Sequence, residues 1–188
     1  NPVWKVSTGN SPNEYSFPIY GAGNVYLSGS LTFYIVNAAD GSTVLAKELA
    51  GPEMHLFGRH AAVGEDFGFY PANEYIEVFN PVTGEAVRQI PVRNGLRMTP
   101  ALYREQMLIV NTEGELLSFS RQNGAEVFAV DTGSGQPIGT DIVVDGNTAY
   151  FIDKNGVLTA VDLVARSVLW QSDLSQYGIF SVLDGIET

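Results

Sequence analysis

The chain has 188 residues, of which 45% are hydrophobic and 16% charged, and it carries a formal net charge of −11. This composition is typical of a well-buried globular domain, and the acidic balance argues against nucleic acid and anionic lipid as partners, because both require clustered Lys and Arg. The absence of cysteine excludes disulfides, thiolate metal sites and cysteine nucleophiles. No apolar run approaches the roughly 18 residues that a membrane span requires.

A repeat runs along the chain. Its copies align on the glycine that ends the segments 37–41, 80–84 and 120–124, and on the arginine that ends a fourth segment, 162–166. The intervals between these four anchor positions are 43, 40 and 42 residues. This spacing is typical of β-propeller blades.

Apolar side chains recur at fixed distances from the anchors. Eight residues before them stand Phe33, Ile76, Leu116 and Leu158, and five before them stand Val36, Phe79, Phe119 and Val161. Three residues after them stand Val44, Val87, Val127 and Leu169, and four after them stand Leu45, Arg88, Phe128 and Trp170. Columns that recur over four copies predict that every copy folds in the same way.

Each copy predicts four short strands. In the last copy we expect strands at 140–144, 148–152, 157–162 and 167–172, with turns at 145–147 and 153–156, because Asp-Gly and Asn-Gly between β-rich runs favour hairpins. No window shows the sustained apolar spacing of a helix. We therefore predict an all-β fold, a single partial β-propeller domain over residues 1–188 with four-stranded antiparallel blades at approximately 15–49, 58–91, 97–131 and 138–173.

The fourth copy resembles the repeat of the PQQ-like, or quinoprotein-type, propellers. That repeat reads roughly Gly-x-apolar-x-Ala-x-Asp, then Thr-Gly, and Trp four residues past the Gly, and residues 156–162 and 166–170 match most of it. Residues 80–84 and 114–124 match it more loosely, and Trp is kept only at Trp170 and Trp4. The resemblance covers nearly the whole chain as a pattern and implies architecture rather than activity.

The two ends extend the pattern. Trp4 falls in the column of Trp170, so residues 1–8 are expected to form the outermost strand of a preceding blade, and residues 182–185 repeat the pattern of 143–146, so 178–188 are expected to hold the first strand of a further one. The start lacks an initiator Met and the order of a signal peptide. We expect the chain to be part of a larger ring, or a second copy or fragment to complete the ring.

Catalytic and metal-binding patterns are weak. His55 and His60 stand five residues apart, which permits a metal or acid–base pair but also suits loop and strand-edge histidines. The segments 145–147 and 153–156 fit hairpin turns better than Ca²⁺ loops, and 133–135 lacks the Lys or helix start of a phosphate cradle. We assign no catalytic residue, no metal ligand and no cofactor; the quinone enzymes that the repeat resembles use PQQ, Ca²⁺, a catalytic Asp and often a Cys pair, which this chain lacks.

The loops between blades are the remaining place for function. They comprise residues 49–59, 91–98, 131–139 and 173–178 and should lie on one face. The candidate binding residues there are Arg59, His60, Arg93 and Arg97, since Arg is enriched at interface hot spots; scattered solubilising charge is the alternative. The aromatic residues Tyr15, Phe17, Tyr20, Phe67, Phe69 and Tyr70 are expected to pack mostly between blades.

The resemblance implies a non-catalytic scaffold that binds a protein partner outside the cytoplasm, in the periplasm or cell envelope, as do the lipoprotein propellers that assist outer-membrane protein assembly. Two alternatives stay open. One is a ligand-binding sensor ectodomain, and the other is a partial quinoprotein dehydrogenase. We expect the chain not to be an enzyme.

Overall fold

The computed structural model describes residues 3–6, 17–28, 32–48, 60–72, 74–96, 98–136 and 141–177. These residues form four antiparallel sheets of four strands, each in simple sequential order. Blade 1 has β1 (Ile19–Gly21), β2 (Asn24–Ser28), β3 (Thr32–Asn37) and β4 (Thr43–Glu48). Blade 2 has β5 (Ala62–Val63), β6 (Gly68–Pro71), β7 (Tyr75–Phe79) and β8 (Ala86–Pro91). Blade 3 has β9 (Ala101–Tyr103), β10 (Gln106–Val110), β11 (Glu115–Ser120) and β12 (Glu126–Asp131). Blade 4 has β13 (Val143–Asp145), β14 (Thr148–Ile152), β15 (Val157–Asp162) and β16 (Ser167–Asp173).

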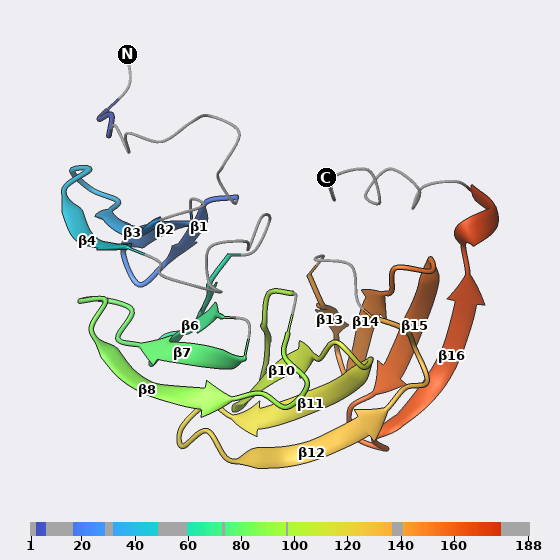
Figure 1. The fold of residues 1–188 in the computed structure, drawn as a ribbon. Helices are drawn as coiled ribbons and strands as arrows, with labels where there is room; N and C mark the ends of the chain where they lie inside the picture. Colours follow the sequence, from blue (N-terminus) through green and yellow to red (C-terminus); the bar gives the residue numbers. More distant parts are fainter. Residues whose placement is uncertain are drawn as a thin grey trace.

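The four sheets lie side by side in an arc, with β4, β8, β12 and β16 along its outer side (Figure 1). The predicted all-β propeller architecture is therefore confirmed. Within the described residues the only helix is the 3₁₀ turn Ser175–Tyr177, and no described helix is long and apolar enough to cross a membrane.

The turn between the third and fourth strands has the same structure in every blade. The anchor residues Gly41, Gly84, Gly124 and Arg166 all have positive φ, of 75°, 77°, 76° and 58°. Each donates its backbone N–H to the carbonyl four residues earlier. Glycine suits this left-handed conformation because it has no Cβ. The repeat spacing seen in the sequence therefore marks one recurring backbone turn.

A β-bulge accompanies each of these turns. The register between the third and fourth strands shifts at the column five residues before the anchor, which holds Val36, Phe79, Phe119 and Val161. All four side chains are buried. A bulge changes the direction of side chains and increases the local twist. Because the bulge recurs at the same position in every blade, the backbone as well as hydrophobicity determines which residue of the strand is buried there.

The core consists of three clusters, one in each seam between neighbouring blades. The first joins blades 1 and 2, the second joins blades 2 and 3, and the third joins blades 3 and 4. Packing between adjacent blades was the expected role of the inner aromatic residues. Phe69 and Tyr70 are buried and Phe67 packs against the second cluster, but Phe17 and Tyr20 are 77% and 72% exposed. Tyr15 lies outside the described residues.

The strand predictions for the last copy are close to the structure. The second and third strands match at both ends, and the fourth is one residue longer than expected. The first strand is described only from Val143, because Asp141 and Ile142 precede it without strand pairing. Residues 3–6 form no strand, and 178–188 lie outside the described residues; the expected strands of a further blade stay predictions.

Candidate functional site

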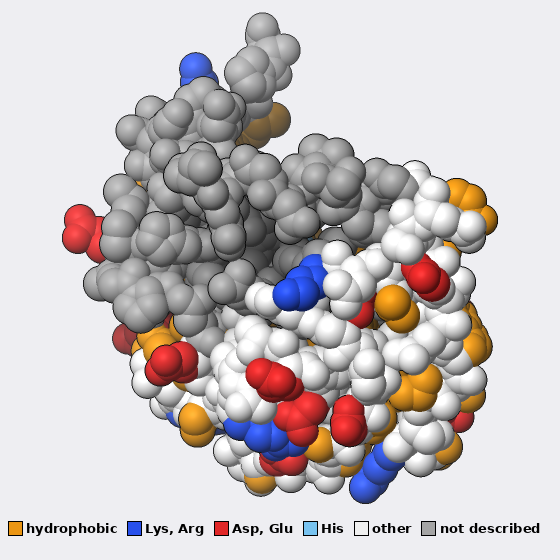
Figure 2. All heavy atoms as spheres, turned by 45° about the vertical axis from the view of Figure 1, so that its right-hand side comes forward, with side chains coloured by type: hydrophobic (Ala, Val, Ile, Leu, Met, Phe, Trp, Pro, Cys, Tyr) orange, Lys and Arg blue, Asp and Glu red, His pale blue; other side chains and the backbone are white. Residues whose placement is uncertain are grey.

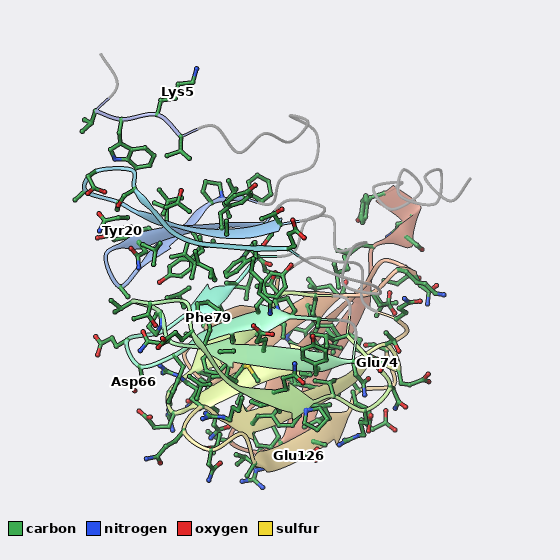
Figure 3. The ribbon with its side chains drawn as sticks, turned by 60° about the vertical axis from the view of Figure 1, so that its left-hand side comes forward. Lys5, Tyr20, Asp66, Glu74, Phe79 and Glu126 are labelled. Carbon is green, nitrogen blue, oxygen red and sulfur yellow. The ribbon has the colours of Figure 1, made fainter. Side chains whose placement is uncertain are left out.

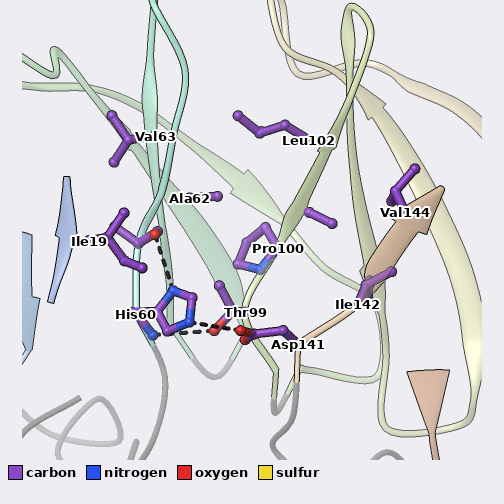
Figure 4. A pocket seen from close by; sticks show the side chains of 12 residues that line it. Ile19, His60, Ala62, Val63, Thr99, Pro100, Leu102, Asp141, Ile142 and Val144 are labelled. Carbon is purple, nitrogen blue, oxygen red and sulfur yellow. Dashed lines mark hydrogen bonds and ion pairs between the residues drawn. The ribbon is translucent and has the colours of Figure 1, made fainter. Parts of the chain in front are cut away.

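A hollow of about 340 Å³ opens where the innermost strands converge. All four blades line it: Ile19 comes from β1, Val63 from β5, Leu102 from β9 and Val144 from β13 (Figure 4). These side chains make its walls apolar. A concave, largely apolar site with a few polar groups is the usual form of a binding pocket, and this volume lies at the small end of the range.

The polar groups of the hollow stand just before the innermost strands. His60 precedes β5, Thr99 precedes β9 and Asp141 precedes β13. The Nε2 atom of His60 lies 2.9 Å from Oδ2 of Asp141, and the backbone N–H of His60 donates to Oγ1 of Thr99 at 3.2 Å. These contacts join blades 2, 3 and 4 at His60. The pair of His60 and Asp141 therefore holds the rim of the hollow together.

The two partners differ in exposure. The side chain of His60 is 13% exposed, whereas that of Asp141 is 51% exposed. The Nδ1 atom of His60 lies 3.3 Å from the carbonyl oxygen of Ala61, so both ring nitrogens face oxygen acceptors. Asp141 therefore presents a carboxylate at the rim, while His60 is held in a fixed orientation.

The predicted binding residues do not all meet in this hollow. His60 lines it, whereas Arg93 is not among its lining residues. Arg59 and Arg97 lie outside the described residues, although their chain neighbours His60 and Met98 are described. His55 also lies outside the described residues.

Arg93 forms a bidentate ion pair that links blade 2 to blade 3. Its Nε and Nη2 atoms donate to the carboxylate of Glu115 at 3.0 and 3.2 Å, and Nη1 donates to Glu126. Hydrogen bonds from Arg93 and from Asn111 lower the pKa of Glu115. The hydrogen bond to Glu115 in turn raises the pKa of Arg93. The arginine is thus engaged within the chain.

The surface charge is dispersed. Figure 2 shows Asp and Glu side chains at several separate places on the visible face, with Lys or Arg directly beside one group of them. Four ion pairs join described residues, and Arg93 takes part in two of them. No group of three or more His, Asp and Glu side chains that could hold a metal occurs among the described residues.

Two segments considered for ligand binding serve as structural connections. Asp153 is 1% exposed and accepts the backbone N–H groups of Gly135, Asn155 and Val157, which is the bonding of a turn. Ser134 is also buried and shares a hydrogen bond of 2.6 Å with Thr159. These polar groups are satisfied inside the fold, as buried polar groups usually are.

Asp141, Thr99 and the apolar lining were not identified from the sequence. The repeat itself carried the signal: His60 stands 24 residues before Gly84, Thr99 stands 25 before Gly124, and Asp141 stands 25 before Arg166. When the copies are superposed, these three residues therefore fall at equivalent positions, just before the innermost strand of each blade.

Comparison with known proteins shows which solved structures share the fold of this chain. No protein-family model and no curated protein matches the chain. Among solved structures, BamB from Moraxella catarrhalis superposes with a TM-score of 0.64 at 15% identity, over 82% of this chain and 50% of that one. The computationally designed Ika8 protein gives 0.67 at 14%, over 83% and 48%. A quinohemoprotein alcohol dehydrogenase from Pseudomonas putida HK5 gives 0.65 at 13%, over 83% and 33%. The chain thus spans half or less of the length of these structures.

Proposed function

We propose that the chain is part of a non-catalytic, extracytoplasmic scaffold of the PQQ-like propeller type, and that it binds a protein partner at the hollow between its innermost strands. The observation that carries this proposal is the chemistry of the hollow. Its walls are apolar, and its two titratable lining residues, His60 and Asp141, bind each other.

This chemistry suits binding more than catalysis. An apolar side chain of a partner that enters the hollow would leave water and contact Ile19, Val63, Leu102 and Val144. Burial of apolar surface contributes about 25 cal/mol per Å², so one inserted side chain can anchor a complex. The polar lining side chains already have partners within the chain, since Thr99 accepts the backbone N–H of His60 and Asp141 bonds to the His60 ring.

The family and the location rest on resemblance. The repeat pattern resembles the lipoprotein propellers that assist outer-membrane protein assembly, and the fold is shared with BamB. A scaffold of this type works in the periplasm or cell envelope. These two likenesses support the proposal that this chain does so too.

A photo-crosslinking experiment tests the proposed surface. A benzophenone amino acid replaces Val144 in the hollow or, as a matched control, Val127 on the outer strand β12, which is 39% exposed. We expect a discrete protein adduct in the cell envelope from the first position and none from the second. Equal adducts from both positions, or no adduct from Val144, would contradict the proposal.

A second candidate, a ligand-binding sensor, is favoured by the size of the hollow. About 340 Å³ is sufficient for a small molecule. Native mass spectrometry of the purified chain separates the candidates, since a retained small ligand would support the sensor. Dye-linked alcohol oxidation after addition of PQQ and Ca²⁺ would instead support a partial quinoprotein dehydrogenase.

A further inference from the structure

The hollow between the innermost strands carries one carboxylate at its rim, that of Asp141. This side chain is 51% exposed, and among the described residues only its Oδ2 atom has a hydrogen-bond partner, the Nε2 atom of His60. A carboxylate has two oxygens and accepts about four hydrogen bonds. Asp141 can therefore accept a hydrogen bond from a second group and keep its contact with His60.

The charges around the hollow favour a cation. Apart from His60 and Asp141, every described residue that lines the hollow is uncharged, so no lysine or arginine among them neutralises the carboxylate. The whole chain carries a net charge of −11. The charge at the rim and that of the whole chain therefore both attract a cationic group and repel an anionic one.

The polar and apolar parts of the hollow lie at opposite ends. Figure 4 shows His60, Thr99 and Asp141 together at one end, and Leu102 and Val63 towards the other. A ligand that suits both ends has an aliphatic stem and a cationic head. Lysine and arginine side chains have this form, since their stems pack on apolar surface while the charged head stays at the polar edge.

The carboxylate is held in place before any ligand binds. The side chain of His60 is 13% exposed, and the backbone N–H of the same residue donates to Thr99, which is 3% exposed. Because Asp141 is bonded to this nearly buried histidine, it loses less side-chain freedom on binding than a surface aspartate does. Such a group is suited to recognition.

We propose that the protein partner inserts a lysine or arginine side chain into the hollow, with its stem along Val63, Leu102 and Val144 and its cationic head at Oδ1 of Asp141. This inference rests on the proposed function and names the side chain that the partner presents there. The hollow then selects by charge as well as by shape. A fully apolar side chain would remove water from Asp141 without replacing its hydrogen bonds, and an acidic one would be repelled.

Small probes test the chemistry of the hollow without the partner. n-Butylammonium has the stem and head of a lysine side chain, 1-butanol has the same stem with a neutral head, and methylammonium has the head without the stem. Chemical-shift titrations by NMR use the purified chain at about pH 8, where an ordinary histidine is neutral. We expect n-butylammonium to shift the amide signals of Leu102 and Val144 and to bind at least about threefold more tightly than 1-butanol. It should bind about tenfold more tightly than methylammonium, because the stem is buried. Equal binding of n-butylammonium and 1-butanol, or no shift at the hollow, overturns the proposal.

Two substitutions identify the carboxylate. Asp141→Asn keeps the shape of the side chain and should remove the preference for n-butylammonium over 1-butanol. Asp145→Asn is the matched control, because Asp145 is exposed at the far end of β13 and does not line the hollow; it should leave the preference unchanged. A folded Asp141→Asn chain that keeps the preference contradicts the proposal, and if this variant does not fold, the three probes on the unsubstituted chain decide.

Crosslinking from Val144 in the cell envelope separates this inference from the proposed function. The adduct should fall at least about threefold in Asp141→Asn and persist in Asp145→Asn. An undiminished adduct in Asp141→Asn overturns the inference and leaves protein binding at the hollow supported. Absence of any adduct from the parent chain contradicts the proposed function, and the probe titrations then show separately whether the hollow selects a cation.

Discussion

The seam between blades 1 and 2 is built differently from the seam between blades 2 and 3. Four of the six buried members of the first cluster are aromatic, against two of the ten in the second. The rings of the first seam touch one another: Phe33 lies 4.8 Å from Tyr70 and 5.5 Å from Phe79, and Tyr26 lies 5.9 Å from Phe79. Figure 3 shows Phe79 between the sheet of blade 1 and that of blade 2.

A glycine makes the aromatic seam feasible. Gly68 in β6 pairs directly with Phe79 in β7, and an added Cβ would stand 2.1 Å from the ring. The corresponding pair in blade 3 is Met107 with Phe119, which leaves no such gap. The space between neighbouring blades can therefore be filled either by large rings beside a glycine or by side chains of intermediate size. In both cases the total side-chain volume has to match the space available.

Truncating the central ring should have the largest effect. We expect Phe79→Ala to lower the free energy of unfolding by about 3–5 kcal/mol, because the change would leave a cavity and remove the ring contacts with both Tyr26 and Phe33. Urea denaturation followed by circular dichroism measures the change. As a control, Phe17→Ala removes a ring that is 77% exposed and should cost less than about 0.5 kcal/mol. Similar losses for both variants would show that the aromatic seam has no special role.

Filling the gap beside the ring should have the next largest effect. Gly68→Ala is expected to destabilise the fold by about 1–3 kcal/mol, because the new methyl group would overlap Phe79. The same denaturation experiment on Gly68→Ala combined with Phe79→Leu tests the cause. The smaller side chain should make room, so the double variant should be more stable than the sum of the two single changes implies. Simple additivity would mean that the glycine acts elsewhere.

A hydrogen bond at the edge of the first seam should contribute less. Tyr26 is buried and donates its hydroxyl to the carbonyl of Pro81 at 2.5 Å, so Tyr26→Phe should cost about 0.5–1.5 kcal/mol. Burial raises the pKa of Tyr26, which means that its neutral form is favoured in the folded state. Stability should therefore fall as the pH rises above about 10, the ordinary pKa of tyrosine. Urea midpoints across alkaline pH should show a smaller decline for Tyr26→Phe than for the parent chain.

The ion pair that links blades 2 and 3 should give the smallest effect. Glu115→Gln removes the carboxylate that binds Arg93, and both side chains are partly exposed, so the cost should be less than about 1 kcal/mol. Because the pKa of Glu115 is lowered in the fold, its contribution is present above about pH 4.3 and is lost as the pH falls below that value. The variant should lose less stability on acidification than the parent chain, and Glu113→Gln serves as a neighbouring control. Parallel acid curves for parent and Glu115→Gln would contradict this account.

The outer half of each blade was predictable because its signals are local. Asn80 and Asp162 begin turns in which their side chains accept a backbone N–H two residues on, and Gly84 has the positive φ that ends such a turn. Asn37 accepts in the same way, Ser120 accepts from the residue three positions on, and the anchor has positive φ in all four copies, so the strand boundaries around these turns could be read from one sequence. The first strand of the last copy was less well predicted, since it was expected at 140–144 and lies at Val143–Asp145.

The contacts between blades were not predictable in the same way. His60 and Asp141 stand 81 residues apart in the sequence, and neither belongs to a local motif. The match of Gly68 to Phe79 depends on the pairing register of two strands, which hydrophobicity alone does not specify. The propeller fold could be predicted from the period, whereas the partners within the hollow required the three-dimensional structure.

The sequential order of strands within every sheet has a consequence for how the chain folds. Each hydrogen-bonded pair in these sheets is a hairpin of neighbouring segments, so loop closure is short and a blade can assemble locally. During synthesis, blade 1 can complete its four strands before blade 2 leaves the ribosome. Its seam residues Phe33 and Ile35 then face solvent until blade 2 arrives to cover them. The nascent chain therefore exposes the apolar seam face of its most recently completed blade. Each new blade covers that face and exposes its own seam face in turn.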